Sequence, residues 1–196
     1  MKADEITERI EASPLKPEIE EIVELELVRP SKIILDDYRI EPPEARPFAM
    51  DGSGGFFSVT PDGRILLIDS EGLYGIVAPD FDTFIAIATG LPIWRDALRF
   101  VGEADIARAR ADWEAFLQKN GFEADLDAPW PYGSAGLSIA TPGAARREIR
   151  AQLGIAASED PFAALYHAVN GLSQDVSVFW QGEPLLLFGR IPTVRH

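Results

Sequence analysis

The sequence predicts an α+β fold in which a mostly antiparallel sheet, made of a central meander and a C-terminal hairpin, is covered by helices. Tight-turn signals join short β-type runs in the middle of the chain. Strands joined this closely must run antiparallel, because a parallel pair needs a long crossover. Helical periodicity then dominates the second half. The length of 196 residues suits a single domain covering residues 1–196.

The N-terminal segment, residues 1–47, is acidic and is the least regular part of the pattern. A helix is predicted within residues 14–28, where apolar residues recur at helical spacing with glutamates between them. Short strands are predicted at 25–27 and 33–35. The prolines that follow predict a loop at 42–47.

The core block, residues 48–98, carries the clearest strand signals. Two β-type runs at 56–60 and 65–69 flank the turn sequence Pro-Asp-Gly-Arg at 61–64. Proline presets the first turn torsion, and glycine supplies the positive φ that a tight reversal needs. A second turn leads to a third run at 73–78, so the block predicts a three-stranded meander.

Helical patterns follow the meander. One helix is predicted to begin after the capping residue Asp80 and to end at Gly90, and a second is predicted at 106–120. Residues 122–142 are rich in proline and glycine and predict an irregular connection. The last block, residues 143–196, is predicted to contain two helices and a closing hairpin.

Charge and composition exclude several functions. The net charge is −14, and most of it lies in the first 82 residues. A chain this acidic is unsuited to binding nucleic acid or an anionic membrane, whereas it suits a basic partner. There is no cysteine, so disulfides, thiolate catalysis and Cys-ligated metals are excluded. The charged N-terminus and the lack of any long apolar run predict a cytoplasmic protein without a signal peptide.

Four residues stand out as candidates for a binding surface. Asp51, Asp69 and Glu71 fall at the ends of the meander strands, so they are expected to lie near one functional edge. Trp130 lies in the irregular connection beside acidic residues and is expected to be exposed. Exposed aromatic residues beside charges are typical of protein-binding surfaces.

Catalytic motifs are absent from the sequence. It has no nucleophile elbow, P-loop or zinc-protease motif, and its two histidines are His167, inside a predicted helix, and His196. The glycine-rich stretch 51–55 precedes a strand, whereas a phosphate-binding loop precedes a helix. Carboxylate pairs leave glycosidase-type or divalent-metal chemistry open. Asp and Glu are also expected at turns and caps, so the sequence predicts no enzyme, no cofactor and no metal.

Several motifs in this order resemble the SUKH superfamily, which includes many bacterial immunity proteins and a yeast regulator of cell-wall synthesis. In the core block they are Phe48-Ala49-Met50-Asp51-Gly52-Ser53-Gly54-Gly55, Ser70-Glu71-Gly72, the helix Asp80–Gly90 and Leu91-Pro92-Ile93-Trp94. Four later stretches resemble the C-terminal part of a bacterial subgroup: Arg147–Leu153, Asp160-Pro161, Leu165–Val169 and Leu187-Phe188-Gly189. The first 45 residues depart from the superfamily, because they lack its helix ending in Asn-Gly.

The resemblance implies a non-catalytic domain that binds another protein. In toxin–immunity systems such a domain neutralises a cognate toxin, often a nuclease, by direct contact. Nuclease toxins tend to be basic, and an acidic surface would steer them into contact. Two alternatives stay open at this point: a regulatory or scaffold module with several protein partners, and a hydrolase using carboxylates or a divalent metal.

Overall fold

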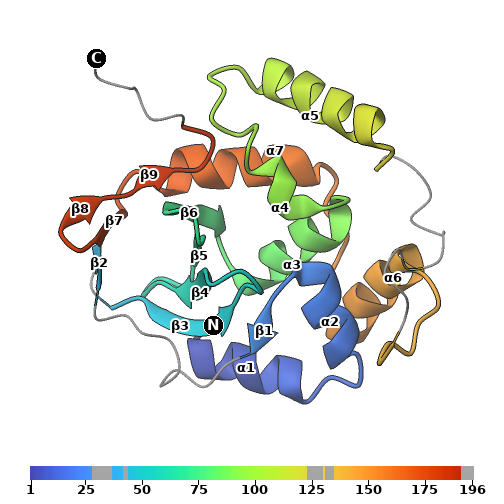
Figure 1. Ribbon diagram of the computed structural model, residues 1–196. Coiled ribbons are helices and arrows are strands. Elements are labelled where there is room, and N and C mark those ends of the chain that lie inside the picture. Colours follow the sequence, from blue (N-terminus) through green and yellow to red (C-terminus); the bar gives the residue numbers. More distant parts are fainter. Residues whose placement is uncertain (28–36, 42–43, 123–129, 131–134, 191–196) are drawn as a thin grey trace.

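A computed structural model describes residues 1–27, 37–41, 44–122, 130 and 135–190 and confirms the α+β class (Figure 1). A six-stranded sheet contains β1 (Glu26–Leu27), β3 (Arg46–Met50), β4 (Phe56–Val59), β5 (Ile65–Ile68), β6 (Leu73–Ala78) and β9 (Leu186–Leu187), in that spatial order. A three-stranded sheet contains β2 (Tyr38–Glu41), β7 (Ser177–Trp180) and β8 (Glu183–Pro184). The α-helices are α1 (Ala3–Glu11), α2 (Lys16–Val23), α3 (Phe81–Gly90), α4 (Trp94–Ala97), α5 (Ile106–Asn120), α6 (Pro142–Leu153) and α7 (Pro161–His167), and a π-helical segment η2 (Ala168–Leu172) continues α7.

The meander β4–β5–β6 is antiparallel throughout and lies where the turn signals predict it. Gly63 and Gly72 take positive φ angles of 94° and 81° in its two turns, which favours glycine at both positions. All four residues of β4 and of β5 are buried. Strands buried this completely must be covered on both faces.

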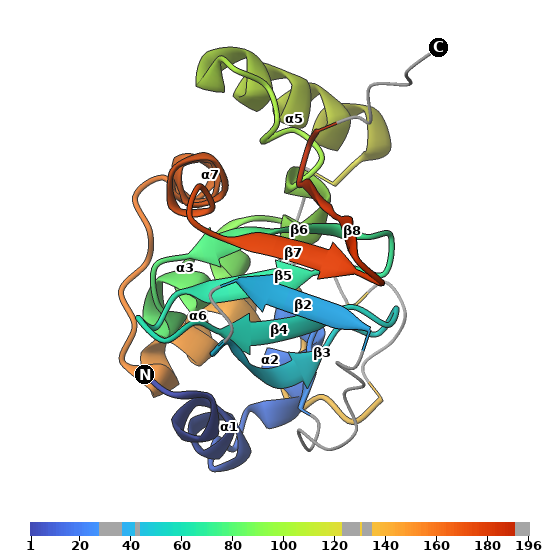
Figure 2. The same cartoon turned by 90° about the vertical axis from the view of Figure 1, so that its left-hand side faces the viewer.

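The two faces of the large sheet have different covers. Phe57, Leu67 and Val77 pack into a core under the helices, whereas alternate residues such as Leu66 and Ile76 pack into a second core under the small sheet. Figure 2 shows the small sheet lying over the large one on the side away from α3 and α6. The fold is therefore built in three layers, with the large sheet in the middle.

The C-terminal hairpin differs from the expectation that it would close the meander. Its strands β7 and β8 pair with each other, β7 also pairs with β2 in the small sheet, and only β9 joins the large sheet, in parallel with β6. The parallel pairing is possible because the whole helical half of the chain separates β6 from β9 and supplies the long crossover.

For the N-terminal segment, one helix was not predicted and one prediction is wrong. The first 12 residues contain α1, whose Ile6 and Ile10 are fully buried; the stripe is so short that the surrounding charge conceals it. Pro47 lies in β3 rather than in a loop. The β3–β4 register shifts between Pro47 and Ala49, and such an irregularity accommodates a residue that lacks an N–H.

The predicted cap at Asp80 is confirmed, and two further helices begin with the same kind of side-chain cap. Asp80, Asp105 and Asp160 each accept a hydrogen bond from a backbone N–H in the first turn of the helix that follows. Gly121 and Gly154 end α5 and α6 with left-handed torsions. These local signals explain why the long helices of the second half of the chain could be predicted, whereas the pairing of its C-terminal strands could not.

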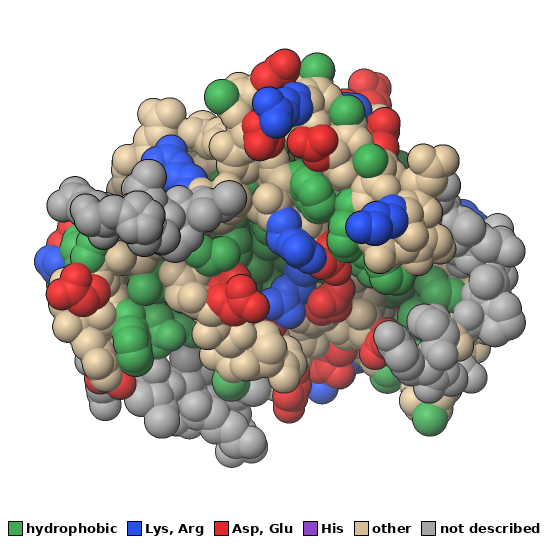
Figure 3. Space-filling view, turned by 45° about the horizontal axis from the view of Figure 1, so that its top comes forward, with side chains coloured by type: hydrophobic (Ala, Val, Ile, Leu, Met, Phe, Trp, Pro, Cys, Tyr) green, Lys and Arg blue, Asp and Glu red, His purple; other side chains and the backbone are tan. Residues whose placement is uncertain are grey.

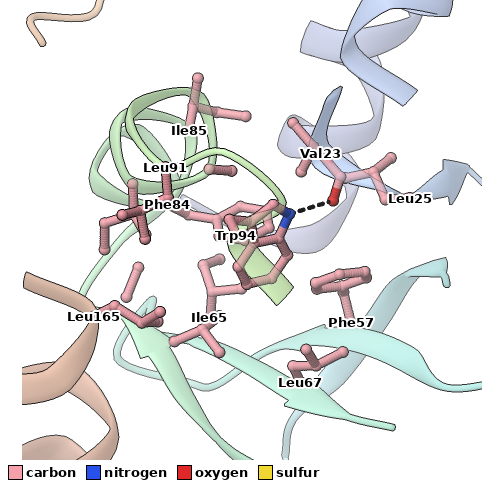
Figure 4. Packing of buried hydrophobic residues seen from close by; sticks show 14 of the residues in the cluster. Val23, Leu25, Phe57, Ile65, Leu67, Phe84, Ile85, Leu91, Trp94 and Leu165 are labelled. Carbon is pink, nitrogen blue, oxygen red and sulfur yellow. Dashed lines mark hydrogen bonds between the residues drawn. The ribbon is translucent and has the colours of Figure 1, made fainter. Parts of the chain in front are cut away.

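Trp94 is the centre of the helical core (Figure 4). Its side chain is fully buried, packs against Phe57 and Phe84, and donates a hydrogen bond of 3.0 Å from Nε1 to the carbonyl of Val23. The preceding residue, Ile93, has a φ of 38°, a strained torsion for a β-branched side chain. Trp94 thereby fixes the end of α2 against the segment that carries Arg95.

Some predictions fall partly or wholly outside the described residues. The strand predicted at 33–35 lies outside them. The irregular connection 122–142 is described at Phe122, Trp130 and from residue 135 onwards, and these parts have no helix or strand before α6. None of the helices in the described residues is long and apolar enough to cross a membrane.

Candidate functional site

Two adjoining hollows meet at the end of α2 and at Arg95 of α4. The larger extends to the β5–β6 turn and the segment after β9, whereas the smaller lies along α2, β1, the β3–β4 loop and residues 135–137. The larger has a volume of about 890 Å³ and the smaller about 640 Å³. Glu24 and Arg95 line both, so the hollows form one continuous surface. We call the surface formed by the two hollows the acidic face.

The charge of this surface is unbalanced towards acid. Seven acidic side chains line the two hollows: Glu20, Glu21, Glu24, Glu26, Asp69, Glu71 and Asp96. Among the described residues only three arginines oppose them there, namely Arg95, Arg99 and Arg190. Figure 3 shows basic side chains in the middle of this side of the molecule with acidic side chains around them. The smaller hollow has four glutamates and Arg95 as its only described base.

Arg95 is held in place by a buried carboxylate. Its Nη2 lies 2.6 Å from Oδ2 of Asp51, whose side chain is fully buried. The other Asp51 oxygen accepts hydrogen bonds from the backbone N–H groups of Ser53 and Gly55 and from the Ser53 hydroxyl. Asp51 therefore shapes the β3–β4 loop and also neutralises Arg95.

Glu24 occupies the rim between the two hollows at the C-terminus of α2. It has a left-handed backbone with a φ of 57°, and its Oε2 lies 3.7 Å from Nη1 of Arg95. Burial raises the pKa of the Glu24 carboxyl above its ordinary value, against the lowering effect of Arg95, and the Asp96 charge adds to the rise.

Asp69 and Glu71 come from the β5–β6 turn. Oδ1 of Asp69 accepts hydrogen bonds from the backbone N–H groups of Glu71 (3.0 Å) and Leu73 (2.7 Å), so the carboxylate orders this turn. Burial is the main cause of a raised Asp69 pKa, and the neighbouring Glu71 charge adds to it. The Glu71 side chain, in contrast, is exposed and free to meet a partner.

The far wall of the larger hollow depends on a close contact between two glycines. A Cβ on Gly102 would lie 2.0 Å from the carbonyl oxygen of Gly189, so neither position has room for a side chain. This contact ties the segment after β9 to the loop before α5. It thereby places Phe188 and Arg190 on the lining of the larger hollow.

The structure brings together three of the four predicted site residues. Asp69 and Glu71 line the larger hollow. Asp51 lies next to them, because a Cβ on Gly55 would lie 2.5 Å from Oδ2 of Asp51 and 2.7 Å from Cα of Asp69. Asp51 itself is buried beneath the surface and is held by Arg95.

The prediction that Trp130 is exposed is wrong. Its side chain is only 8% exposed and belongs to the helical core, and its Nε1 donates a hydrogen bond of 2.8 Å to the carbonyl of Ile139. Burial of an indole ring stabilises the folded state even in an irregular segment, provided that a backbone acceptor is available for its N–H. Sequence neighbours therefore do not reveal its exposure.

Sequence reasoning missed Arg95 and the acidic end of α2. The sequence contains a cluster of glutamates at positions 20, 21, 24 and 26, but such a cluster is equally typical of the solvent-exposed side of a helix. Arg95 gives no local signal, because its role comes from residues 44 and 71 positions away along the chain.

The chemistry available at this surface is the recognition of positive charge, with ionisable carboxyls beside it. Among the residues that the structure describes, no group of three or more His, Cys, Asp or Glu side chains could hold a metal ion. His167 does not line either hollow. Comparisons with protein-family models, curated proteins and solved structures find no match to the chain.

Proposed function

We propose that the chain is a non-catalytic protein-binding domain whose acidic face binds a basic partner protein, and that it serves as an immunity protein against a bacterial toxin such as a nuclease. The observation that carries the proposal is the excess of acid on this surface, seven acidic side chains against three arginines. The resemblance to the SUKH superfamily supports the immunity role.

The arrangement of the charges supports binding from solution. Glu21, Glu26 and Glu71 are exposed, and their backbones belong to a helix, a strand and a tight turn, so the three charges stay on the same surface. Opposite charges at fixed positions raise the association rate of two proteins more than they raise the final affinity. Fast capture is what neutralisation of a toxin requires.

Charge reversal tests the proposal. The chain would be mixed with each protein encoded by the genes that flank its own, with any toxin made catalytically inactive. For the one that binds, the double variant Glu21→Lys, Glu26→Lys should lower the association rate constant by about tenfold or more, because both side chains line the smaller hollow.

A matched control separates the acidic face from net charge. Glu114→Lys with Glu148→Lys makes the same change in charge on exposed positions of α5 and α6 that line neither hollow. It should leave the rate constant within about threefold of the parent. Equal losses in both double variants, or no binding to any flanking gene product, would contradict the proposal.

A regulatory scaffold would use the same surface but bind several partners. A chain that binds and protects against one flanking toxin is an immunity protein. A chain that ignores every flanking product but recovers several defined regulators is a scaffold. The number of partners competing for the Glu21–Glu26 surface therefore separates the two roles.

One observation favours a second candidate, carboxylate-based hydrolysis. Glu24 and Asp69 both have raised pKa values and line the larger hollow, and such pairs occur at active sites. A metal-assisted version predicts a rise in melting temperature with Mg²⁺, Ca²⁺ or Mn²⁺ that Asp69→Asn abolishes. No rise with any of the three ions would remove that version.

A further inference from the structure

Two exposed apolar side chains belong to strands that lie close to the β5–β6 turn of the acidic face. Trp180 is 46% exposed and Leu186 is 37% exposed, and both are among the few large apolar side chains that the described surface presents. They belong to residues 177–188, which contain β7, β8 and β9 and which we call the C-terminal strap. Neither the Trp180 nor the Leu186 side chain belongs to either hydrophobic core.

The strap borders the larger hollow directly. Leu186 in β9 lies opposite Leu73 in β6, and Leu73 lines that hollow. A Cβ on Gly72 would lie 3.6 Å from Cδ2 of Leu185, so the strap also touches the turn between Asp69 and Leu73. The exposed side chain of Leu186 is thus next to the acidic lining.

Trp180 lies at the same end of the sheets as Asp69. Its partner across β2 and β7 is Tyr38, whose ring meets the ring of Phe56 edge-on with centroids 5.2 Å apart. Phe56 pairs in turn with Ile68, the residue before Asp69. In Figure 1 the β7–β8 hairpin lies at the left of the molecule, next to β9.

The backbone around Trp180 is well fixed. The N–H of Gln181 donates a hydrogen bond of 2.8 Å to the carbonyl of Asp37, and the N–H of Leu185 donates one of 2.8 Å to the carbonyl of Val178. An aromatic side chain on a fixed backbone loses little entropy on binding. Tryptophan is accordingly enriched among the residues that dominate binding energy at protein interfaces.

We infer that Trp180 and Leu186 are the apolar anchor of the interface whose charged part is the acidic face. The inference rests on the proposed function and adds the chemistry of the partner. The partner carries an apolar cleft, which receives the indole of Trp180, flanked by lysines or arginines that meet Glu71 and the glutamates of α2.

Charge decides between this partner and a second copy of the chain. The chain has a net charge of −14, and two acidic faces brought together would repel each other. A basic protein instead gains both charge attraction and burial of Trp180. A dimer of the free chain that Trp180→Ala dissociates, detected by sedimentation, would overturn the inference.

Selection from a randomised peptide library displayed on phage tests the inference with a defined probe. The immobilised full chain should enrich peptides that combine lysine or arginine with a large apolar residue. Trp180→Ala and Leu186→Ala should each weaken the binding of the enriched peptides by about tenfold or more, the loss expected of an interface anchor. Using both variants guards against a folding defect in one.

The control is Phe122→Ala, which removes another exposed aromatic side chain, 42% exposed, that packs on Phe116 of α5. It should leave peptide binding unchanged. Enrichment of the same peptides on Trp180→Ala, of peptides without basic residues, or of none would overturn the inference. If a flanking gene product depends on Glu21 and Glu26 but not on Trp180, the inference fails while the proposed function stands. If the enriched peptides depend on Trp180 but no flanking gene product binds the chain, the immunity role fails while the inference about the apolar anchor stands.

Discussion

At the scale of single residues, Arg95 connects the inside of the molecule to the candidate site. It meets the fully buried carboxylate of Asp51 on one side and the half-exposed carboxylate of Glu24 on the other. A buried carboxylate without its cation is strongly destabilising, whereas an exposed pair contributes little. The same arginine therefore stabilises the fold through Asp51 and tempers the charge of the site through Glu24.

Arg95→Ala should lower the free energy of unfolding by about 3 kcal/mol, because it leaves the carboxylate of Asp51 buried and unpaired. The control is Arg99→Ala, whose side chain is 67% exposed and meets Asp96 at 3.5 Å. It should change stability by less than about 0.5 kcal/mol. Urea denaturation of both variants measures the difference, and similar losses would show that Asp51 does not need its cation.

Glu18 should make stability depend on acid pH. Burial of the carboxylate opposes its ionisation, but hydrogen bonds from Ser138 and from the backbone N–H of Ile139 outweigh burial, so its pKa lies below the ordinary 4.5. A lowered folded-state pKa gives stability that is present above pH 4.5 and is lost as the pH falls through the folded value.

Glu18→Gln should accordingly be about 2 kcal/mol less stable than the parent at neutral pH, with the difference shrinking in acid. Urea denaturation at neutral pH and at about pH 3.5 measures this. Glu114→Gln, at an exposed position, should change stability by less than about 0.5 kcal/mol at either pH. A Glu18→Gln deficit that persists undiminished in acid would contradict the assignment.

At the scale of elements, the end of α2 combines strain with charge. Glu24 takes a left-handed backbone that favours glycine, and it lines both hollows. Gln181, in the turn between β7 and β8, takes a similar torsion with a φ of 50° and lines neither hollow. Strain at a site surface is a common cost of placing a functional side chain.

Glu24→Gly and Gln181→Gly should each raise the free energy of unfolding by about 0.5–1 kcal/mol, because each relieves a left-handed torsion. Only Glu24→Gly should also weaken binding of the basic partner, since only it removes a charge from the acidic face. Thermal unfolding and binding of the flanking gene product measure the two effects. A Glu24→Gly variant that is less stable than the parent and binds normally would show that the Glu24 backbone is not strained and that its charge does not contribute to binding.

At the scale of the whole molecule, the acidic charge affects folding and binding in opposite directions. A net charge of −14 repels itself in the compact state while it attracts a basic partner. Salt screens both effects, with a Debye length of about 8 Å at physiological ionic strength. Most of this charge lies in the first 82 residues, so the repulsion is concentrated around α1, α2 and the meander.

Raising NaCl from low to physiological concentration should therefore raise the midpoint of thermal unfolding and lower the association rate with the basic partner. The two measurements on one preparation check the expectation. The Glu21→Lys, Glu26→Lys variant should show a smaller salt effect on both. An unfolding midpoint that falls with NaCl would mean that attractive ion pairs outweigh self-repulsion.

The sequence by itself determined the features that depend on near neighbours in the chain. The turn at Pro61–Arg64, the cap at Asp80 and the stop at Gly121 are local, because a torsion or a side-chain cap decides each of them. The same logic placed Asp69 and Glu71 at the edge of the meander, where the larger hollow lies.

The tertiary structure alone decided which segments distant in sequence meet. Arg95 finds Asp51 and Glu24 across the fold, β9 reaches β6 after the helical half of the chain, and burial of Trp130 leaves Trp180 as an exposed tryptophan. Apolar burial is non-directional, so an alternating or helical pattern specifies which face is buried but not against which partner. The outline of the site could therefore be predicted from local signals, whereas its arginine and its apolar border required the packed molecule.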